Sequence, residues 1–482
     1  MINLEKVFCL LKAILLAMKK DIFKWHQFCV IYFLYLVFCF KTKSFYYNSM
    51  WRLNPLLNKI CILAGLMIFS IHSFAQLNPE GVYQPNIKTV RFHSYANQET
   101  MPLYNLNSDE KLELHFDDLD GDVKNYYYTF QLCDYNWQPV NMSPFAYIKG
   151  FTQQRINTYR YSTLAYTRYT HYQATIPENN SRPIISGNYL LKVFLDGDTT
   201  KLAFTRTLLV LEPKCIVSAQ VVQPFTPNTF RTHQRLRFTV NAQGLNSFNP
   251  NRDIKVVVMQ NFRWDNAKMN IPPTFIRGNS LEFNTEDQFV FPGGKEWRWL
   301  DLRSFSLLSE RVDSADKHKN STDIYVRPDI DRNIQKYYYY GDLNGMYLTT
   351  TYESINPYWQ GDYATVHFSF LPQSQNPYPG KDVYMIGQLT DYKLSDENKL
   401  VFNDEKGMYE CSKYLKQGYY SYGYMLVDRN DPSQQTDLDG NYWETENTYT
   451  ILVYYKSFSD QADKLIGVSK IDTRTDRPGF SF

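Results

Sequence analysis

Residues 189–211 read YLLKVFL-DGD-TTK-LAFTRTLLVL, two apolar runs on either side of a short polar segment. The runs are rich in leucine, β-branched and aromatic residues, which is typical of strands that pack on a core. The segment between them contains Asp196-Gly197, and such pairs favour a tight hairpin turn because both residues tolerate positive φ. We therefore predict a β-hairpin with strands at 189–195 and 202–211.

Similar runs recur along the chain and are separated by turn-forming residues. Leu112–Phe116 alternates between apolar and polar residues and leads into the acidic turn 117–122, after which 125–132 (NYYYTFQL) is the expected partner strand. In the run 364–370 every second side chain is large and apolar, which predicts one buried face. Long helical periodicity is absent. These features predict an all-β fold of tandem immunoglobulin-like β-sandwich domains.

Two breaks in the pattern suggest where these domains end. The first is Glu212-Pro-Lys-Cys215, directly after a strand, and the second is 356–361 (NPYWQG), directly before one. We predict a first sandwich over 77–213, a second over 214–358, a third over 359–458 and a polar tail over 459–482.

The region before the first sandwich has the features of an export signal. A twelve-residue apolar run, Ile60–Ile71, follows Arg52 and Lys59 and is followed by Ser73-Phe-Ala75. A basic start, a short apolar run and a small-x-small end define a secretory signal peptide, here with cleavage between Ala75 and Gln76. The run is shorter than the roughly 20 residues that span a bilayer. A retained anchor is the alternative.

Residues 1–49 precede a signal peptide that is complete from Met50 onward. Our hypothesis is that Met50 is the true start and that 1–49 is an upstream extension of the reading frame. The alternative is a membrane anchor formed by the second apolar stretch, 28–40. N-terminal sequencing of the unprocessed precursor distinguishes the two, because a precursor beginning at Met1 contradicts the hypothesis.

Composition excludes several classes of protein. Hydrophobic residues make up 44% and charged residues 21% of the chain, which excludes a disordered protein, and a mean hydropathy of −0.45 excludes a polytopic membrane protein. The net charge of +2 gives no reason to expect a nucleic-acid partner. Without residues 1–75, 42 basic and 47 acidic residues remain, so the mature chain carries −5. Aromatic residues reach 17%, with 40 Tyr and 32 Phe, which favours β structure.

Motifs that carry catalytic or metal chemistry are missing from the sequence. There is no glycine-rich phosphate loop, zincin motif, nucleophile elbow or CxxC pair. Cys133, Cys215 and Cys411 are too widely spaced for a disulfide framework or a zinc site, so we interpret them as buried thiols, with one bridge and a free thiol as the alternative. His115 and His171 lie in strand patterns and are given structural roles. We expect no enzymatic activity, no cofactor and no metal.

Two acidic clusters have calcium-like spacing. Asp118, Asp120 and Asp122 alternate as in an EF-hand loop, and so do Asp437, Asp439 and Asn441, but both clusters lack the correctly placed glycine and the closing glutamate. We interpret them as polar hairpin turns and keep calcium binding as the alternative. A carboxylate pair for glycoside hydrolysis also stays open, since its geometry is spatial.

Tyrosines are clustered at 126–128, 337–340 and 419–424. Consecutive aromatic residues in a strand place rings on both faces, so one face fills the core and the other is exposed or covered by a partner. Candidate partner contacts are Tyr337, Tyr338, Tyr339, Tyr340 and Tyr392.

Several stretches together resemble one family. In the first half these are LELHFDDL (112–119), YYYTFQLCDYNW (126–137) and the segments at 150–151, 159–162, 169–172 and 176–177. Further along they are WLDLRS (299–304), SERV (309–312) and YGDLNG (340–345). The chain resembles the plug protein of the type IX secretion system of Bacteroidetes over nearly its whole mature length.

The resemblance implies a periplasmic protein that is peripherally associated with the outer membrane. Its partner would be the outer-membrane β-barrel translocon, whose periplasmic opening a plug seals when no substrate passes. It implies neither a nucleic-acid partner nor a small-molecule substrate, and it assigns no function to single residues.

The third predicted domain is also similar to immunoglobulin-like early-set domains that bind starch or glycogen. The similar stretches are DVYMIG (382–387), GMYE (407–410) and GYYSYGY (418–424). The usual tryptophan is missing, and Tyr392 stands nearest to its place. The alternative function is therefore an exported carbohydrate-binding or surface-assembly protein, whose α-glucan binding Tyr392→Ala would abolish.

Overall fold

The hairpin expected around Asp196-Gly197 is present. β10 (Gly187–Leu195) pairs antiparallel with β11 (Leu202–Leu211), and Asp196 and Gly197 between them have φ of 57° and 71°. Two successive left-handed residues give a turn whose twist matches the flanking strands, which explains the Asp-Gly pair. β4 (Tyr126–Cys133) pairs with the other side of β10, so the hairpin lies in the middle of a sheet.

The computed structural model describes residues 79–476 except 243, 246 and 248. The signal peptide, the predicted cleavage site at Ala75 and Gln76 and the extension before Met50 lie outside the described residues. The described part is nearly all β and consists of tandem β-sandwiches, which confirms the predicted fold class. Within it, no helix has the length and apolar character needed to cross a membrane.

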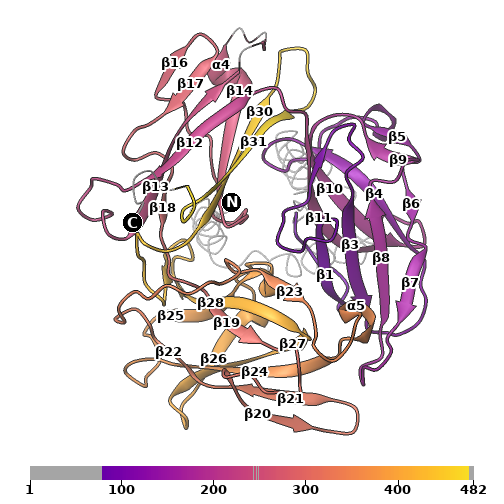
Figure 1. The fold of residues 1–482 in the computed structure, drawn as a ribbon, viewed down its shortest axis with the longest axis vertical. Coiled ribbons are helices and arrows are strands. Elements are labelled where there is room, and N and C mark those ends of the chain that lie inside the picture. The colour runs from indigo at the N-terminus through magenta and orange to yellow at the C-terminus, as the bar shows by residue number, and fades with distance from the viewer. Residues whose placement is uncertain (1–78, 243, 246, 248, 477–482) are drawn as a thin grey trace, which may run out of the picture. The chain divides into compact units, whose positions relative to one another are not determined.

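The first sandwich packs a four-stranded sheet against one half of a nine-stranded sheet (Figure 1). The four-stranded sheet has the order β1 (Ile87–Ser94), β3 (Leu112–Asp118), β8 (Thr170–Ile176) and β7 (Thr158–Tyr161). The facing strands are β11, β10, β4 and β6 (Gln154–Arg155), with β2 (Leu103–Asn105) beside β11. A two-stranded ribbon consists of β5 (Ile148–Gly150), which follows η1 (Pro144–Ala146), and β9 (Ser181–Pro183).

The predicted pairing of strand 112–116 with strand 125–132 is wrong. β3 pairs with β1 and β8, whereas β4 pairs with β10 and β6. The two strands lie in opposite sheets, and the rings of Phe116 and Tyr126 meet in the core with centroids 5.0 Å apart. Each strand has an apolar face, and facing sheets bury both of these faces against each other.

The second sandwich is built from two distant parts of the chain. Its first sheet contains β12 (Ile216–Val222), β13 (His233–Asn241), β17 (Ser280–Phe283), β16 (Phe275–Arg277) and β18 (Val290–Pro292). The facing strands are β15 (Lys268–Met269), β14 (Ile254–Gln260), which follows α4 (Pro250–Asp253), then β30 (Thr448–Tyr455) and β31 (Lys464–Asp472). β14 and β30 are antiparallel neighbours although almost 200 residues separate them.

This arrangement corrects the predicted boundaries. The segment 448–455 was expected in the third sandwich but completes the second, and 464–472 forms β31 instead of a polar tail. The strands between 298 and 349 were expected in the second sandwich but belong to the third. Sequence breaks mark the ends of strands, whereas membership of a sheet depends on pairing between residues far apart in the chain.

The third sandwich is one eleven-stranded sheet around a single core, and it is inserted between β18 and β30. Its strands are β19 (Arg298–Asp301), β20 (Val312–Lys317), β21 (Thr322–Val326), β22 (Asp329–Ile330), β23 (Tyr347–Thr349), β24 (Tyr363–Leu371), β25 (Lys381–Ile386), β26 (Lys399–Asn403), β27 (Met408–Lys416), β28 (Gly418–Asp428) and β29 (Gln435–Asp437). Short helical turns are α5 (Pro357–Gln360), η2 (Gln388–Thr390) and η3 (Asp396–Asn398). The predicted buried face of β24 is confirmed, because Val366, Phe368 and Phe370 are at most 2% exposed.

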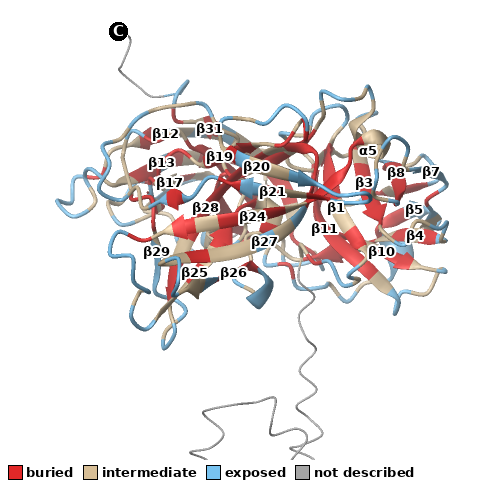
Figure 2. Ribbon diagram, turned by 90° about the horizontal axis from the view of Figure 1, so that it is seen from below, coloured by how far each residue is buried: buried red, intermediate tan, exposed pale blue. Residues whose placement is uncertain are grey.

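The nine-stranded sheet joins the first and second sandwiches. β31 runs parallel to β11 where Leu465 meets Leu211, so one sheet continues from one sandwich into the next. A separate apolar cluster forms at this join, and it includes Leu209, Val257 and Leu452. Buried residues follow the strands, and exposed residues follow the connecting loops (Figure 2).

The three cysteines of the described residues form no disulfide. Cys133 is buried, and Cys215 and Cys411 are partly buried. Burial raises the pKa of the Cys133 thiol to about 12, which keeps the thiol protonated. The interpretation of these residues as buried thiols agrees with the structure.

Candidate functional site

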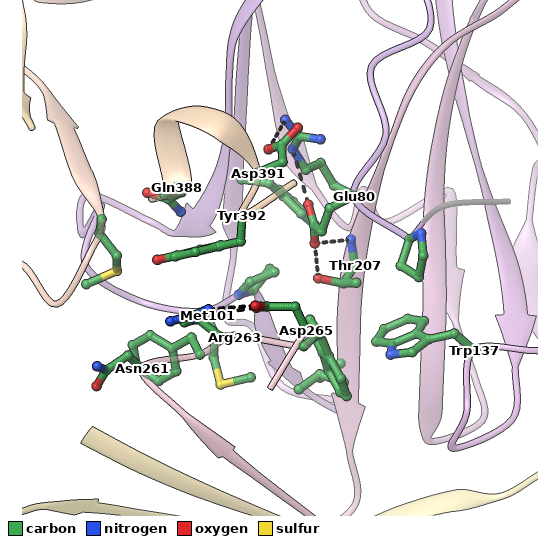
Figure 3. A pocket seen from close by; sticks show the side chains of 18 of the residues that line it. Glu80, Met101, Trp137, Thr207, Asn261, Arg263, Asp265, Gln388, Asp391 and Tyr392 are labelled. Carbon is green, nitrogen blue, oxygen red and sulfur yellow. Dashed lines mark hydrogen bonds and ion pairs between the residues drawn. The ribbon is translucent and has the colours of Figure 1, made fainter. Parts of the chain in front are cut away.

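A cavity of about 420 Å³ lies where the three sandwiches meet (Figure 3). Each sandwich supplies charged or aromatic side chains to its wall. The first supplies Glu80, Arg91, Trp137 and Arg206, the second Arg263 and Asp265, and the third Gln388, Asp391 and Tyr392. Concave sites between domains are common places for ligands and for domain contacts.

Arg206 connects the first sandwich to the third. Its guanidinium lies 3.4 Å from a carboxylate oxygen of Glu80 and 3.5 Å from one of Asp391, and it is 7% exposed. Burial alone would lower the pKa of Arg206, but the two carboxylates outweigh burial and raise it. Thr207 donates to Glu80 from its backbone N–H at 3.0 Å and from its hydroxyl.

Arg263 connects the second sandwich to the third. It makes a bidentate pair with Asp265, with N–O distances of 3.2 and 2.6 Å, and its guanidinium lies 4.8 Å from the ring centre of Tyr392. Arg91 of the first sandwich donates to the side chain of Gln388 in the third. Three carboxylates of the wall, Glu80, Asp265 and Asp391, are each paired with an arginine, so among the described residues the wall joins the sandwiches through paired charges.

Tyr392 lines this cavity and is partly buried. Its ring lies between Arg263 and the indole of Trp297, whose centroid is 6.2 Å away at a steep angle. Its hydroxyl is buried and has no hydrogen-bond partner among the described residues. A sugar stacks on an open ring face, and Tyr392 offers no such platform, so the geometry gives no support to α-glucan binding at this residue.

The cluster Tyr337–Tyr340 divides into internal and exposed side chains. Tyr337 donates to the carboxylate of Glu296 and Tyr339 to that of Glu446. Tyr340 accepts from Arg332 at 2.6 Å and donates to the carbonyl oxygen of Trp297 at 2.9 Å. Tyr338 is 74% exposed. Partner contact through Tyr337, Tyr338, Tyr339, Tyr340 and Tyr392 stays a prediction, and within the tyrosine run Tyr338 has the most accessible ring.

A buried polar network that sequence reasoning missed joins the first and third sandwiches. Asp117 on β3 accepts from His171 Nδ1 at 2.7 Å, from Lys416 Nζ at 2.5 Å and from the hydroxyl of Tyr363 at 2.6 Å. Asp117 and Lys416 are each 1% exposed. Burial alone would raise the pKa of Asp117, but Lys416 and then His171 outweigh burial and lower it. Asp117 is therefore a buried carboxylate with a full set of partners.

Two further histidines, His115 and His93, extend this network along the same face of the first sandwich. His115 Nδ1 lies 3.1 Å from His171 Nε2, the ring of His93 stacks on that of His115, and Tyr358 of α5 stacks on His115 with centroids 3.8 Å apart. Burial lowers the pKa of His93 and of His115 to about 4. Around His115, Glu113 favours the protonated ring, but burial outweighs it. Both rings are therefore neutral at pH 7 and pack as structural groups, as was predicted for His115.

This stack predicts that stability falls in mild acid. In the unfolded chain a histidine takes up its proton near pH 6.5, whereas His115 takes it up near pH 4 when folded, so stability is complete above pH 6.5 and is lost as the pH falls toward 4. For one such group the loss between pH 7 and pH 5 is about 2 kcal/mol. Urea unfolding of His115→Gln should therefore lose about 2 kcal/mol less over this range than the wild type does. His318→Gln, on an exposed side chain, is the control. An unchanged slope in His115→Gln contradicts the prediction.

The acidic cluster at Asp118, Asp120 and Asp122 comes together in space, with its carboxylate oxygens within 4.8 Å of one another. Lys124 occupies the position that a cation would take. Its ammonium lies 2.9 Å from Asp118 and 3.5 Å from Asp122, and it also contacts Asp120. In the second cluster Asp439 is paired with Arg298 and Arg332. The cationic side chains supply the positive charge in both turns, in agreement with the interpretation as polar turns.

Calcium is accordingly expected to have little effect on the protein. Adding about 1 mM calcium should shift the melting temperature by less than about 1 °C, because Lys124 already neutralises the carboxylates. Lys124→Ala should cost about 1–2 kcal/mol in calcium-free buffer, since it removes the positively charged partner of the buried Asp118. The control is Lys201→Ala, an exposed pair with Asp196 that should change stability by less than about 0.5 kcal/mol. A large calcium-induced rise in the melting temperature of the wild type contradicts this expectation.

Comparison with known proteins adds the family. The family model described as Type 9 secretion system plug protein 1st domain matches residues 87–212. A solved structure, the crystal structure of a hypothetical protein from Parabacteroides merdae ATCC 43184, superimposes with a TM-score of 0.78 at 28% identity and covers 82% of this chain and 98% of that chain. Trypsin-activated alpha-2-macroglobulin from Escherichia coli matches at 11% identity over 84% of this chain and 30% of that chain, with a TM-score of 0.15 that supports no conclusion. No curated protein matches the sequence.

The matched span coincides with one unit of the structure. It begins at Ile87, the first residue of β1, and ends at Glu212, directly after β11, so it covers the first sandwich from its first strand to its last. The resemblance drawn from the stretches between residues 112 and 177 is thereby confirmed. The first sandwich, residues 87–212, therefore belongs to the family of type 9 secretion system plug protein first domains.

Proposed function

We propose that the mature chain is the periplasmic plug subunit of the type IX secretion translocon, which binds the outer-membrane barrel and seals its periplasmic opening. Membership of the plug family by itself implies a protein of the cell envelope that associates with type IX secretion components. The observation that carries the finer proposal is the family match over the whole first sandwich.

The contacts between sandwiches support a sealing role. A seal performs no chemistry, but it must keep its shape against the opening that it covers. The first and second sandwiches share one sheet, and buried ion pairs at Arg206 and Asp117 join the first to the third. Parts that are joined by a continuous sheet and by desolvated, fully partnered charges separate only at high cost. We therefore propose a structural subunit that works without an enzymatic step or a cofactor.

Two measurements test this function. Purified mature chain, residues 76–482, should form a stable complex with the purified translocon barrel, as detected by size-exclusion chromatography. Deleting the gene should let a large antibiotic such as vancomycin cross the outer membrane, and a plasmid copy of the wild-type gene should restore the barrier. A mature chain that does not bind the purified barrel contradicts the proposal, and so does a deletion strain with an intact barrier.

A further inference from the structure

One stretch of the first sandwich differs in charge from the rest of the mature chain. Residues 135–177 contain no Asp or Glu over 43 positions, although the mature chain has 47 acidic residues and a net charge of −5. The same stretch holds Lys149, Arg155, Arg160 and Arg168. The local charge of this run is therefore opposite in sign to that of the mature chain.

Most of this stretch lies along one side of the first sandwich. β7 is the last strand of the four-stranded sheet, and β6 is the last strand of the nine-stranded sheet at this end. The ribbon strand β5 lies at the same side, and Figures 1 and 2 both place β5 and β7 at the side of the first sandwich that is far from the second. Thr163, two residues after β7, donates its backbone N–H to the carbonyl oxygen of Trp359 in α5 of the third sandwich at 2.9 Å. The edge strands β6 and β7 therefore have backbone N–H and C=O groups with no neighbouring strand on their outer side.

The side chains at this edge are aromatic in the middle and basic on the flanks. Tyr159 lies opposite Tyr172, a core residue, so Tyr159 and Tyr161 project between the two sheets at the open edge, where they are 40% and 55% exposed. Arg160 lies on the other face of β7, opposite His171, and its exposed guanidinium lies 6.0 Å from the ring centre of Trp359 in α5. Arg155 lies opposite Tyr127, on the face of β4 that points away from the core. Phe151, directly after β5, is 63% exposed.

The basic groups of this edge carry charge that nothing in the described chain neutralises. Lys149, Arg155 and Arg160 are all exposed, and within residues 79–476 none of them makes an ion pair with a carboxylate. Charges on an edge strand can serve only to prevent aggregation. Prevention of aggregation does not explain why exposed aromatic rings lie beside these charges. A protein interface does explain them, because Tyr, Phe and Arg are enriched at interfaces and Asp and Glu are depleted.

We propose that this edge face, defined by Lys149, Phe151, Arg155, Tyr159, Arg160 and Tyr161, is the surface through which the first sandwich docks onto an acidic protein surface of the translocon barrel. The proposal rests on the proposed function and names the docking face and the chemistry of its partner. Carboxylates on the partner would pair with Arg155 and Arg160, and the rings would fill the middle of the contact. Because the rest of the mature chain is net negative, an acidic partner is attracted to this face and repelled elsewhere.

The open strand edges favour a protein partner over a lipid surface. Two of the three basic residues are arginine, whose planar fork binds a carboxylate or a phosphate through two hydrogen bonds, so the charge of this face suits either partner. The open edges of β6 and β7 can also bind an extended peptide segment through backbone hydrogen bonds, which a lipid headgroup layer cannot provide in register. Vesicle binding is therefore included as an outcome of the test that overturns the proposal.

The test compares matched variants of the full mature chain. In the edge variant, Lys149→Glu, Arg155→Glu and Arg160→Glu are combined. In the control variant, Arg231→Glu, Lys319→Glu and Arg327→Glu are combined, three exposed residues of the other sandwiches that also make no ion pair within the described residues. Affinity for the purified barrel is measured by biolayer interferometry at low and high salt, and folding of each variant is checked by its melting temperature.

The edge variant is expected to bind the barrel roughly a hundredfold more weakly, and the control variant within about threefold of the wild type. A second variant, Phe151→Ala with Tyr161→Ala, should bind about tenfold more weakly while the salt dependence of binding is kept. If the charge variant does not fold, the aromatic variant still tests the docking face.

The possible results of the binding measurements distinguish a failure of the proposed function from a failure of the proposed docking face. If the wild type does not bind the barrel at all, the proposed function fails. If the wild type binds and the folded edge and aromatic variants bind equally well, the docking face is overturned and the plug function stands. If the same residues instead govern binding to vesicles of phosphatidylglycerol and phosphatidylethanolamine, and not to the barrel, the surface is a lipid contact and the proposal of a protein partner is overturned.

Discussion

Removing residues 464–482 is expected to unfold the second sandwich, although its first sheet and strand β14 are untouched. The truncation deletes β31, whose Leu465, Ile466 and Ile471 are buried in the apolar clusters of the nine-stranded sheet. Each such side chain contributes roughly 1.5–3 kcal/mol when fully buried, so the loss exceeds about 5 kcal/mol and approaches the whole stability of a domain. It also exposes the edges of β30 and β11. We expect the truncated chain to be insoluble, or to unfold at a clearly lower urea concentration.

Point variants on the same strand separate burial from chain length. Leu465→Ala should cost about 2–4 kcal/mol by urea unfolding, because it leaves a cavity beside Leu211. Ser469→Ala, at a partly exposed position of β31, should stay within about 0.5 kcal/mol of the wild type. A soluble truncated chain with an unchanged unfolding midpoint would restore the expectation that the end of the chain is a polar tail.

Asp117→Ala is expected to destabilise the protein by about 3–5 kcal/mol, far more than the removal of an average surface carboxylate would. The variant leaves the ammonium of Lys416 buried beside Tyr363 with no counter-charge, and it leaves His171 Nδ1 without its acceptor. The control is Asp120→Ala, a mostly exposed carboxylate three residues away, which should cost less than about 1 kcal/mol. Urea unfolding followed by tryptophan fluorescence measures both variants.

The same network has a defined acid dependence. The folded pKa of Asp117 is lowered, so its contribution is complete above the ordinary aspartate pKa of about 3.9 and is lost as the pH falls through the lower folded value. The double variant Asp117→Leu with Lys416→Met removes both charges together and should recover most of the stability that Asp117→Ala loses. Should the double variant be no more stable than Asp117→Ala, the loss came from packing and not from the unpaired Lys416.

Local sequence patterns predicted local structure well. The hairpin at Asp196-Gly197 and the buried face of β24 are both present, because turn preference and side-chain alternation depend on neighbouring residues. The pairing of β3 with β4 was wrong, although both strands were placed correctly. An alternating strand specifies which face is buried, but it does not specify whether its neighbour in sequence lies beside it or across the core.

The candidate site residues show the same difference between local features, which the sequence predicted, and tertiary contacts, which it did not. The aromatic clusters were visible in the sequence, yet their environment was not, since Tyr392 is enclosed by Arg263 and Trp297 from other strands. Asp117 and Lys416 stand 299 positions apart and gave no motif. The only hint of the buried network in the sequence was the acidic pair Asp117-Asp118 at the end of an apolar strand. A polar turn explained this pair equally well.

By itself the sequence determined the class of this protein: a Tyr-rich chain of β-strands whose first-half segments carry the resemblance to a secretion plug. The tertiary structure alone decided that the third sandwich is inserted into the second, that the last strand completes a sheet begun at β10 and β11, and that Asp117 meets Lys416. The physical reason is the range of the interactions. Strand formation and turns depend on a few adjacent residues, whereas sheet order and buried ion pairs depend on which distant apolar faces and charges leave water together.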